Sequence, residues 1–183
     1  MQISREENLK NIVMLSQFGE QEQEYTLASK TEWLQNILKE LKEELGSEAG
    51  EQVEEIKVDL KIKRLHNTLY GEHLVVRTSY RANYHADCVR CLKTTPQNLE
   101  GEIAACFINS HFENDEEYAD ITDIFVDNEE MELCFHKKGK VDLAEFIREQ
   151  FMIDMNPLPL HDPNCKGLCQ ICGEDRNSIE CGH

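Results

Sequence analysis

Cysteine and histidine residues in two parts of the chain have the spacing of metal ligands. Cys88-Val89-Arg90-Cys91 forms one C-x-x-C element, and Cys169-Gln170-Ile171-Cys172 forms a second near the C-terminus. The other candidate ligands in that final stretch are His161, Cys165, Cys181 and His183. Zinc takes four nitrogen or sulfur ligands, and a C-x-x-C turn delivers two thiolates to one ion without strain. The pattern predicts zinc that ties the C-terminal tail to the body of the protein.

The eight candidates can be divided between one or two zinc ions. In a two-ion arrangement the sets are Cys88, Cys91, His161 and Cys165, and then Cys169, Cys172, Cys181 and His183. In a one-ion arrangement the two C-x-x-C pairs share a single ion. We prefer two ions because that arrangement uses all eight candidates in two sets of four.

Catalytic chemistry has less support in the sequence. A thioredoxin-like C-x-x-C opens a helix after a strand, but Lys93-Thr94-Thr95-Pro96 does not have a helical pattern. No Gly-rich phosphate loop, G-x-S-x-G elbow or H-E-x-x-H motif is present. Zinc sites with four protein ligands also leave no open position for a reacting water. We expect a protein that is not an enzyme, with a zinc hydrolase or a thiol redox enzyme as the weaker alternatives.

Charge is distributed unevenly along the chain. The formal net charge is -17, which argues against indiscriminate binding to nucleic acid and suits a basic partner. The segment from Ile56 to Lys93, however, has eight basic and three acidic residues, or +5, which leaves -22 for the rest. One basic island therefore lies in an acidic chain.

Membrane and export segments are not evident. No apolar run approaches the roughly 18 residues of a membrane helix, and the first residues, Met-Gln-Ile-Ser-Arg-Glu-Glu, lack the apolar part of a secretory signal. We expect a cytoplasmic protein, where thiols stay reduced and favour metal binding over disulfides. The length of 183 residues fits one α+β domain over 1–160, with a helical portion at about 1–50 and a β-rich body at about 51–160, followed by a Cys/His-rich tail over 161–183.

Hydrophobic periodicity places the first elements. The apolar cluster from Leu9 to Leu15 is too short to assign as strand or helix. Ser29 and Glu32 have the spacing of a capping box, followed by an amphipathic helix that Gly46 can end. From Ile56 the period changes to two, and two alternating runs around Gly71 predict an antiparallel hairpin with one face in the core. Its solvent face and the adjoining knuckle would gather Lys57, Lys61, Lys63, Arg77, Arg81 and Arg90.

The second half predicts further strands and one helix. Strands are expected at 102–109 and 131–136, with a solvated acidic loop over 113–130 that has a short apolar element at 121–126. Asp142 and Glu145 resemble a second capping box, which starts a helix that Asn156-Pro157 ends. The expected fold is α+β: an antiparallel sheet or partial barrel with an amphipathic N-terminal helix, a C-terminal helix and a zinc-knuckle tail.

Three motifs together resemble a known family. They are Cys88-Val89-Arg90-Cys91-Leu92, then Leu158-Pro159-Leu160-His161, then Cys165-Lys166-Gly167-Leu168-Cys169-Gln170-Ile171-Cys172-Gly173. From about Ile56 to the C-terminus, the chain resembles the YceD family, the large ribosomal RNA subunit accumulation proteins. The resemblance implies a cytoplasmic protein of bacterial or plastid type without known enzymatic activity. Family tails of this type tend to close on Cys-x-Cys, whereas this chain closes on Cys181-Gly182-His183, which keeps a ligand.

Two hypotheses for function follow. In the first, a ribosome-assembly factor holds large-subunit ribosomal RNA, or the pre-ribosome that contains it, on the basic hairpin face. In the second, the acidic remainder makes the protein an adaptor or chaperone for a basic ribosomal protein. Salt-dependent RNA binding favours the first, and a protein partner that survives nuclease treatment favours the second.

Overall fold

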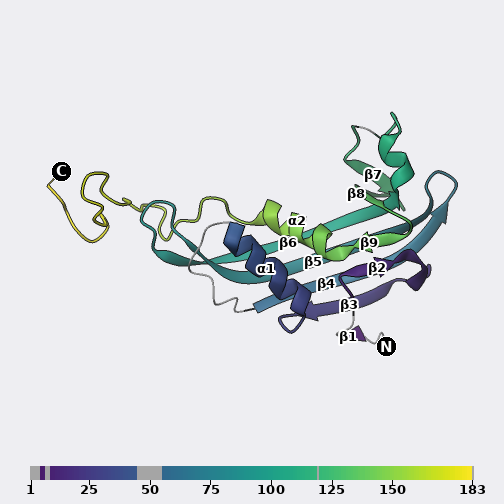
Figure 1. The fold of residues 1–183 in the computed structure, drawn as a ribbon, viewed down its shortest axis with the longest axis horizontal. Helices are drawn as coiled ribbons and strands as arrows, with labels where there is room; N and C mark the ends of the chain where they lie inside the picture. The colour runs from purple at the N-terminus through teal and green to yellow at the C-terminus, as the bar shows by residue number, and fades with distance from the viewer. Residues whose placement is uncertain (1–4, 7–8, 45–54, 119, 183) are drawn as a thin grey trace.

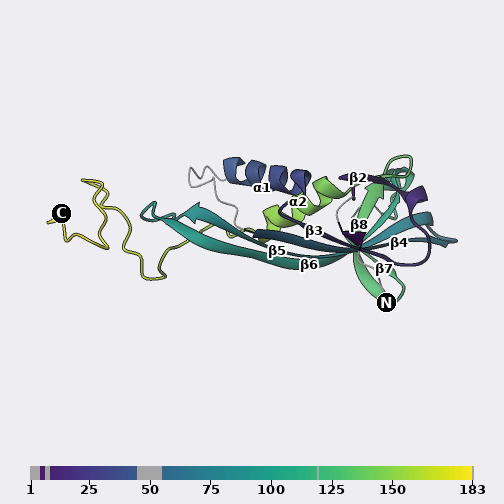
Figure 2. The same cartoon turned by 90° about the horizontal axis from the view of Figure 1, so that it is seen from below.

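The computed structural model describes residues 5–6, 9–44, 55–118 and 120–182 (Figure 1). Two helices lie on one face of a long sheet, and the C-terminal tail extends from one end of it (Figure 2). The elements are β1 (Arg5–Glu6), β2 (Ile12–Met14), η1 (Leu15–Gln17), β3 (Gln23–Ala28), α1 (Glu32–Glu44), β4 (Glu55–Asn67), β5 (Gly71–Asp87), β6 (Thr94–Asn109), η2 (Ser110–Asn114), β7 (Asp123–Val126), β8 (Glu129–His136), β9 (Lys140–Asp142) and α2 (Leu143–Asp154). The fold is α+β, as the sequence predicts.

The described strands form one large open sheet and one small sheet. The large sheet has the order β1-β3-β4-β5-β6-β8-β7, and β2 pairs with β9 separately. Neighbouring strands are antiparallel except for β1 beside β3 and β6 beside β8. Of the two expected architectures, the structure has an open sheet and not a barrel, because β1 and β7 are separate edges; the sheet is mostly but not wholly antiparallel.

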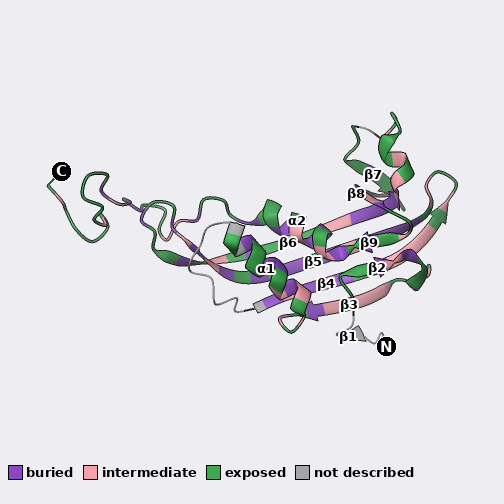
Figure 3. Ribbon diagram, in the orientation of Figure 1, coloured by how far each residue is buried: buried purple, intermediate pink, exposed green. Residues whose placement is uncertain are grey.

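The hairpin of β4 and β5 carries much of the core, as its two-residue period predicts. Val58 lies opposite Tyr80, and Ile62 lies opposite Val76. All four side chains are buried under the helices, and Figure 3 shows buried residues along the strands. Burying an aliphatic side chain of this size stabilises a fold by about 1.5–3 kcal/mol relative to leaving it exposed. These pairs therefore fix which face of the hairpin meets the helices.

The two helices begin differently from each other. Asp142 caps α2 by accepting a hydrogen bond from the Glu145 N–H at 3.1 Å, so the predicted start of this helix is confirmed. Ser29 does not cap α1, because its Oγ accepts a hydrogen bond from the Ile56 N–H at 3.0 Å. The expected end of the first helix at Gly46 lies outside the described residues. No helix in the described part of the chain is long and apolar enough to cross a membrane.

The first 50 residues contain more strand than the sequence pattern indicates. The apolar cluster at 9–15 includes β2, which pairs with β9. The polar stretch after it includes β3, which pairs with β4. Only Leu27 is buried in β3, so the alternation of apolar and polar residues that reveals a strand is missing there. The helical portion expected at 1–50 therefore includes three described strands, β1, β2 and β3, in addition to α1.

Candidate metal centre

The first C-x-x-C element forms the tight turn between β5 and β6, at the end of the hairpin from which the tail extends. The Leu92 N–H donates to the Cys88 carbonyl at 2.8 Å, and the Cys88 N–H donates to the Lys93 carbonyl at 2.9 Å. Leu92 has a left-handed backbone with φ of 62°. These bonds hold Cys88 and Cys91 on one turn that projects from the sheet. We call residues 88–91 the knuckle.

The tail returns to the knuckle after α2 ends. Val89 N–H donates to the Pro159 carbonyl, and Leu168 N–H donates to the Arg90 carbonyl, both at 2.9 Å. The Arg90 guanidinium also donates to the Cys165 carbonyl at 3.0 Å. The backbone of the tail therefore clasps the knuckle on both sides.

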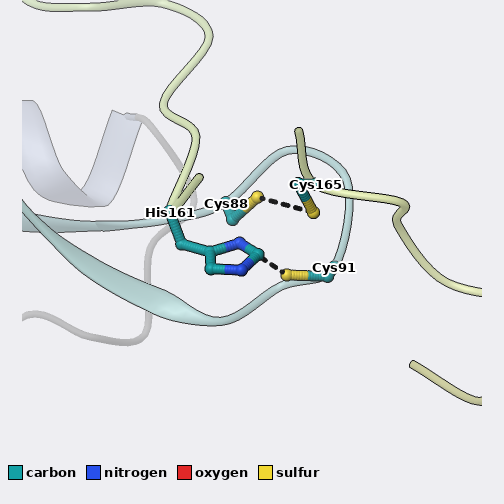
Figure 4. Close-up of side chains that lie close together, drawn as sticks. All are labelled: Cys88, Cys91, His161 and Cys165. Atoms are coloured by element: carbon teal, nitrogen blue, oxygen red, sulfur yellow. Dashed lines mark hydrogen bonds between the residues drawn. The ribbon is translucent and has the colours of Figure 1, made fainter. Parts of the chain in front are cut away.

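This clasp brings four of the predicted ligands together. The donor atoms of Cys88, Cys91, His161 and Cys165 all lie within 4.8 Å of one another (Figure 4). The Cys88 and Cys165 sulfurs are 3.8 Å apart, and the Cys91 sulfur is 3.2 Å from His161 Nδ1. Tetrahedral zinc with bonds of 2.3 Å to sulfur would separate two thiolates by about 3.8 Å. We name this set the clasp group; its three cysteines are buried.

The pKa values of the clasp-group thiols favour a cation bound among them. Burial raises the pKa of Cys88, but hydrogen bonds from His161 and from backbone N–H groups outweigh burial and lower it to about 5. Burial and the neighbouring thiols of Cys165 and Cys88 together raise the pKa of Cys91 to about 11, although the Lys93 backbone N–H lowers it. A second buried thiolate therefore needs a positive charge beside it. The set of three thiols and one imidazole fits a metal ion that supplies this charge.

The remaining predicted ligands form a second group farther along the tail. The sulfurs of Cys169, Cys172 and Cys181 lie within 4.8 Å of one another. Backbone N–H groups of Cys172 and Ile171 lower the pKa of Cys169 to about 6. Cys172 is exposed, and His183 lies outside the described residues. We name these three cysteines the tail group. The two C-x-x-C pairs therefore lie in different groups, whereas the one-ion arrangement places them around one ion.

One glycine explains how the tail approaches the knuckle so closely. Gly167 has φ of +72°, and a Cβ placed on it would lie 3.0 Å from the Arg90 carbonyl oxygen. Gly173 has φ of +78° with nothing within 4 Å of such a Cβ. Both positions need a left-handed backbone, which favours glycine. Only Gly167 is also needed for close contact with the other segment.

Asn177 is a site residue that the ligand pattern misses. Its Nδ2 donates to the Cys165 sulfur at 3.4 Å, and its Oδ1 accepts from the Lys166 N–H at 2.8 Å. Hydrogen bonds of this kind orient metal ligands and stabilise thiolate charge. Asn177 is not a preferred ligand type, so spacing could not identify it. The turn-forming sequence Asp175-Arg176-Asn177-Ser178 is the signal that was available.

The residues predicted to bind nucleic acid lie on the hairpin face opposite the helices, except for Arg90 in the knuckle. Lys57 lies opposite Arg81, and Lys61 lies opposite Arg77. Most of these cations are paired with carboxylates: Lys57 with Asp59 at 2.5 Å, Lys61 with Glu24 at 3.4 Å, Lys63 with Asp127 at 2.6 Å, and Arg77 with Glu22 at 3.2 Å and Glu129 at 2.5 Å. The expected basic face is thus interleaved with acids from β3 and the residue before it, from β4 and β8, and from the β7–β8 turn. Arg81 has no ion pair within the described residues.

Comparison with protein families identifies the chain. A family model described as large ribosomal RNA subunit accumulation protein YceD matches residues 76–183. This match covers more than half of the chain and includes the knuckle, the clasp group and the tail group. The chain belongs to the YceD family. Among curated proteins and among solved structures, nothing matches this YceD-family chain.

Proposed function

We propose that this protein is a cytoplasmic, non-enzymatic ribosome biogenesis factor that supports the accumulation of large-subunit ribosomal RNA. The observation that carries the proposal is the family match over residues 76–183, whose description names that process. The matched region begins in β5 and contains every described cysteine and histidine of the two groups. The part of the protein that defines the family is therefore the part that the clasp holds together.

Zinc is the metal that we propose for both groups. In the clasp group, Cys88, Cys91, His161 and Cys165 would supply all four ligands of a structural site. Such a site leaves no position for substrate, which supports a role without catalysis. Leu160 and Leu168 pack against the three buried cysteines and shield them from water. In the tail group, His183 would add a fourth ligand to the three cysteines.

For RNA, the proposed contacts are the cations at the knuckle end of the hairpin. Arg81 is exposed without an ion pair in the described structure, and Arg90 lies in the knuckle itself. Lys57, Lys61, Lys63 and Arg77 would have to exchange a carboxylate partner for phosphate. Since phosphate affinity depends on how many cations are neutralised by RNA, we expect Arg81 and Arg90 to contribute most.

Crosslinking in cells tests the RNA proposal. Irradiation followed by sequencing of RNA bound to the protein should recover large-subunit ribosomal RNA. The variant R81Q, which leaves the Arg90 hydrogen bond of the clasp intact, should lower the recovery by about threefold or more, whereas the control K39Q on α1, far from the hairpin face, should not. Recovery of no ribosomal RNA, or equal recovery from both variants, would overturn the proposed contacts.

A second candidate function is an adaptor for a basic ribosomal protein. The observation that favours it is the pairing of the hairpin cations with carboxylates, because this pairing leaves a chain of net charge -17 with little free positive surface. An acidic surface attracts basic partners and repels RNA. Affinity purification after nuclease digestion distinguishes the two candidates, since only the adaptor should retain its partner.

A further inference from the structure

The sheet divides where β8 leaves β6. β8 pairs with β6 only along Ala105–Asn109 of β6. The earlier residues of β8 pair with β7. β6 and β8 therefore diverge at Ala104 and enclose a groove of about 740 Å³. Gln150 and Ile153 of α2 border this groove. We call this groove the wedge.

One side of the wedge is an unpaired strand edge. β6 pairs with β5 along the stretch that includes Glu100–Ala104, but no described strand pairs with its other edge there. Ile103 and Ala104 are half-exposed in the middle of a long strand. Backbone N–H and C=O groups on such an edge can pair with another chain, and proteins usually block them.

The lining of the wedge combines apolar and acidic side chains. Its apolar members are Ile103, Ala104, Ile121, Leu133 and Ile153, and its carboxylates are Glu102, Asp123, Glu130 and Glu132. No Lys or Arg lines it, and none forms an ion pair with these carboxylates in the described structure. Burial, with Glu149 and Asp123 nearby, raises the pKa of Glu132. The lining of the wedge is thus negative, and Lys61 and Arg77 lie in the neighbouring pocket that Glu102 and Glu130 also border.

We propose that the wedge binds an extended, basic segment of a protein partner, which adds to the sheet as a strand beside β6. The backbone of that segment would pair with the free edge at Glu100–Ala104. On the helix side of the sheet, its side chains would meet Ile103 and Glu130, and on the opposite side they would meet Glu102 and Leu133. Each face of the segment would therefore carry both Lys or Arg and small apolar side chains. RNA does not suit this groove, because its phosphates would meet carboxylates. The inference relies on the proposed ribosomal role only for the source of such a basic segment.

A synthetic peptide tests the wedge without RNA and on the intact protein. The probe is a fluorescent ten-residue peptide in which Lys and Val alternate in pairs, so that both residue types lie on each face of the strand. It is compared with a Glu/Val peptide of the same pattern, and binding is read by anisotropy at several salt concentrations. Two further probes are N-methylated at odd or at even residues, which removes the backbone donors from one edge of the strand. Strand addition predicts that one methylated probe loses at least about tenfold in affinity while the other stays within about threefold.

Variants locate the binding. E102Q/E130Q should weaken the Lys/Val peptide by about tenfold, whereas the control E113Q/E116Q, which removes two exposed carboxylates of η2 and the loop after it, should change it by less than twofold. Equal losses in both variants, or equal binding of the two methylated probes, would overturn the proposal. Sedimentation that shows self-association through this edge would also overturn it. Each of these failures leaves the RNA crosslinking result unaffected.

Discussion

The clasp group and the tail group have similar ligands but different surroundings. The clasp group joins the knuckle to a segment 70 or more residues later, and its cysteines are buried. The tail group gathers cysteines that are near one another in sequence, and Cys172 is exposed. A metal that joins distant segments removes more conformational freedom than one that closes a short loop, by roughly 1–2 kcal/mol for loops of these lengths. The clasp group should therefore stabilise the fold, whereas the tail group should order only the tail.

The largest expected difference in stability between the two groups comes from removing one ligand from each group in separate variants. C165A should lose the clasp-group metal and lower the free energy of unfolding by at least about 3 kcal/mol. This is a fraction of the roughly 10–16 kcal/mol that structural zinc contributes when it binds small domains. A loss of about 3 kcal/mol is a fall in Tm of about 6–12 °C. C172A should lower Tm by less than about 3 °C. Thermal unfolding and zinc analysis of both variants check this difference, and equal falls in Tm would show that the two groups are equivalent.

The two glycines provide a smaller, matched comparison. G167A should cost about 2 kcal/mol or more, because a left-handed alanine is strained by roughly 1–2 kcal/mol and its Cβ would press on the Arg90 carbonyl. G173A has the same backbone strain without a neighbour, so it should cost only about 1 kcal/mol. Chemical unfolding curves measure both. A larger cost for G173A would mean that the tail does not dock on the knuckle as described.

The smallest effect is expected at Asn177. N177A removes the hydrogen bond to the Cys165 sulfur and should weaken zinc affinity by about tenfold without changing the number of ions bound. Competition with a chromogenic chelator measures the affinity. S178A, which loses only a hydrogen bond to the Asp175 carbonyl, is the control and should bind zinc normally. If both variants bound zinc as the wild type does, Asn177 would have no part in the site.

The sequence predicts the local features of this protein well. Alternating residues reveal the β4–β5 hairpin because one of its faces is buried from Ile56 to Ile62 and from Leu74 to Ala86. Asp142 marks the start of α2 because the N–H that it caps is only three residues away. The spacing of Cys88 and Cys91 indicates a metal-ligand turn because both cysteines belong to one short turn. Each of these signals lies within one short segment.

Apart from the clasp group, which the count of candidate ligands predicts as one set of four, features that depend on distant segments were not predictable. β3 has little buried surface of its own and pairs through its backbone. The carboxylates that neutralise Lys63 and Arg77 come from positions 52 or more residues away in sequence. The wedge exists only because β8 leaves β6 at Ala104. Periodicity describes neighbours along the chain, so it contains no information about these strand pairings and ion pairs between distant segments.

Hydrogen exchange at the clasp tests the central claim most directly. The backbone N–H groups of Val89 and Leu168 donate across the junction between knuckle and tail. In the zinc-loaded protein both should exchange slowly, and chelation should speed their exchange by at least about tenfold while the amides of the β4–β5 core change little. Unchanged exchange of Val89 and Leu168 after complete zinc removal, or a purified protein that contains no zinc, would contradict the account.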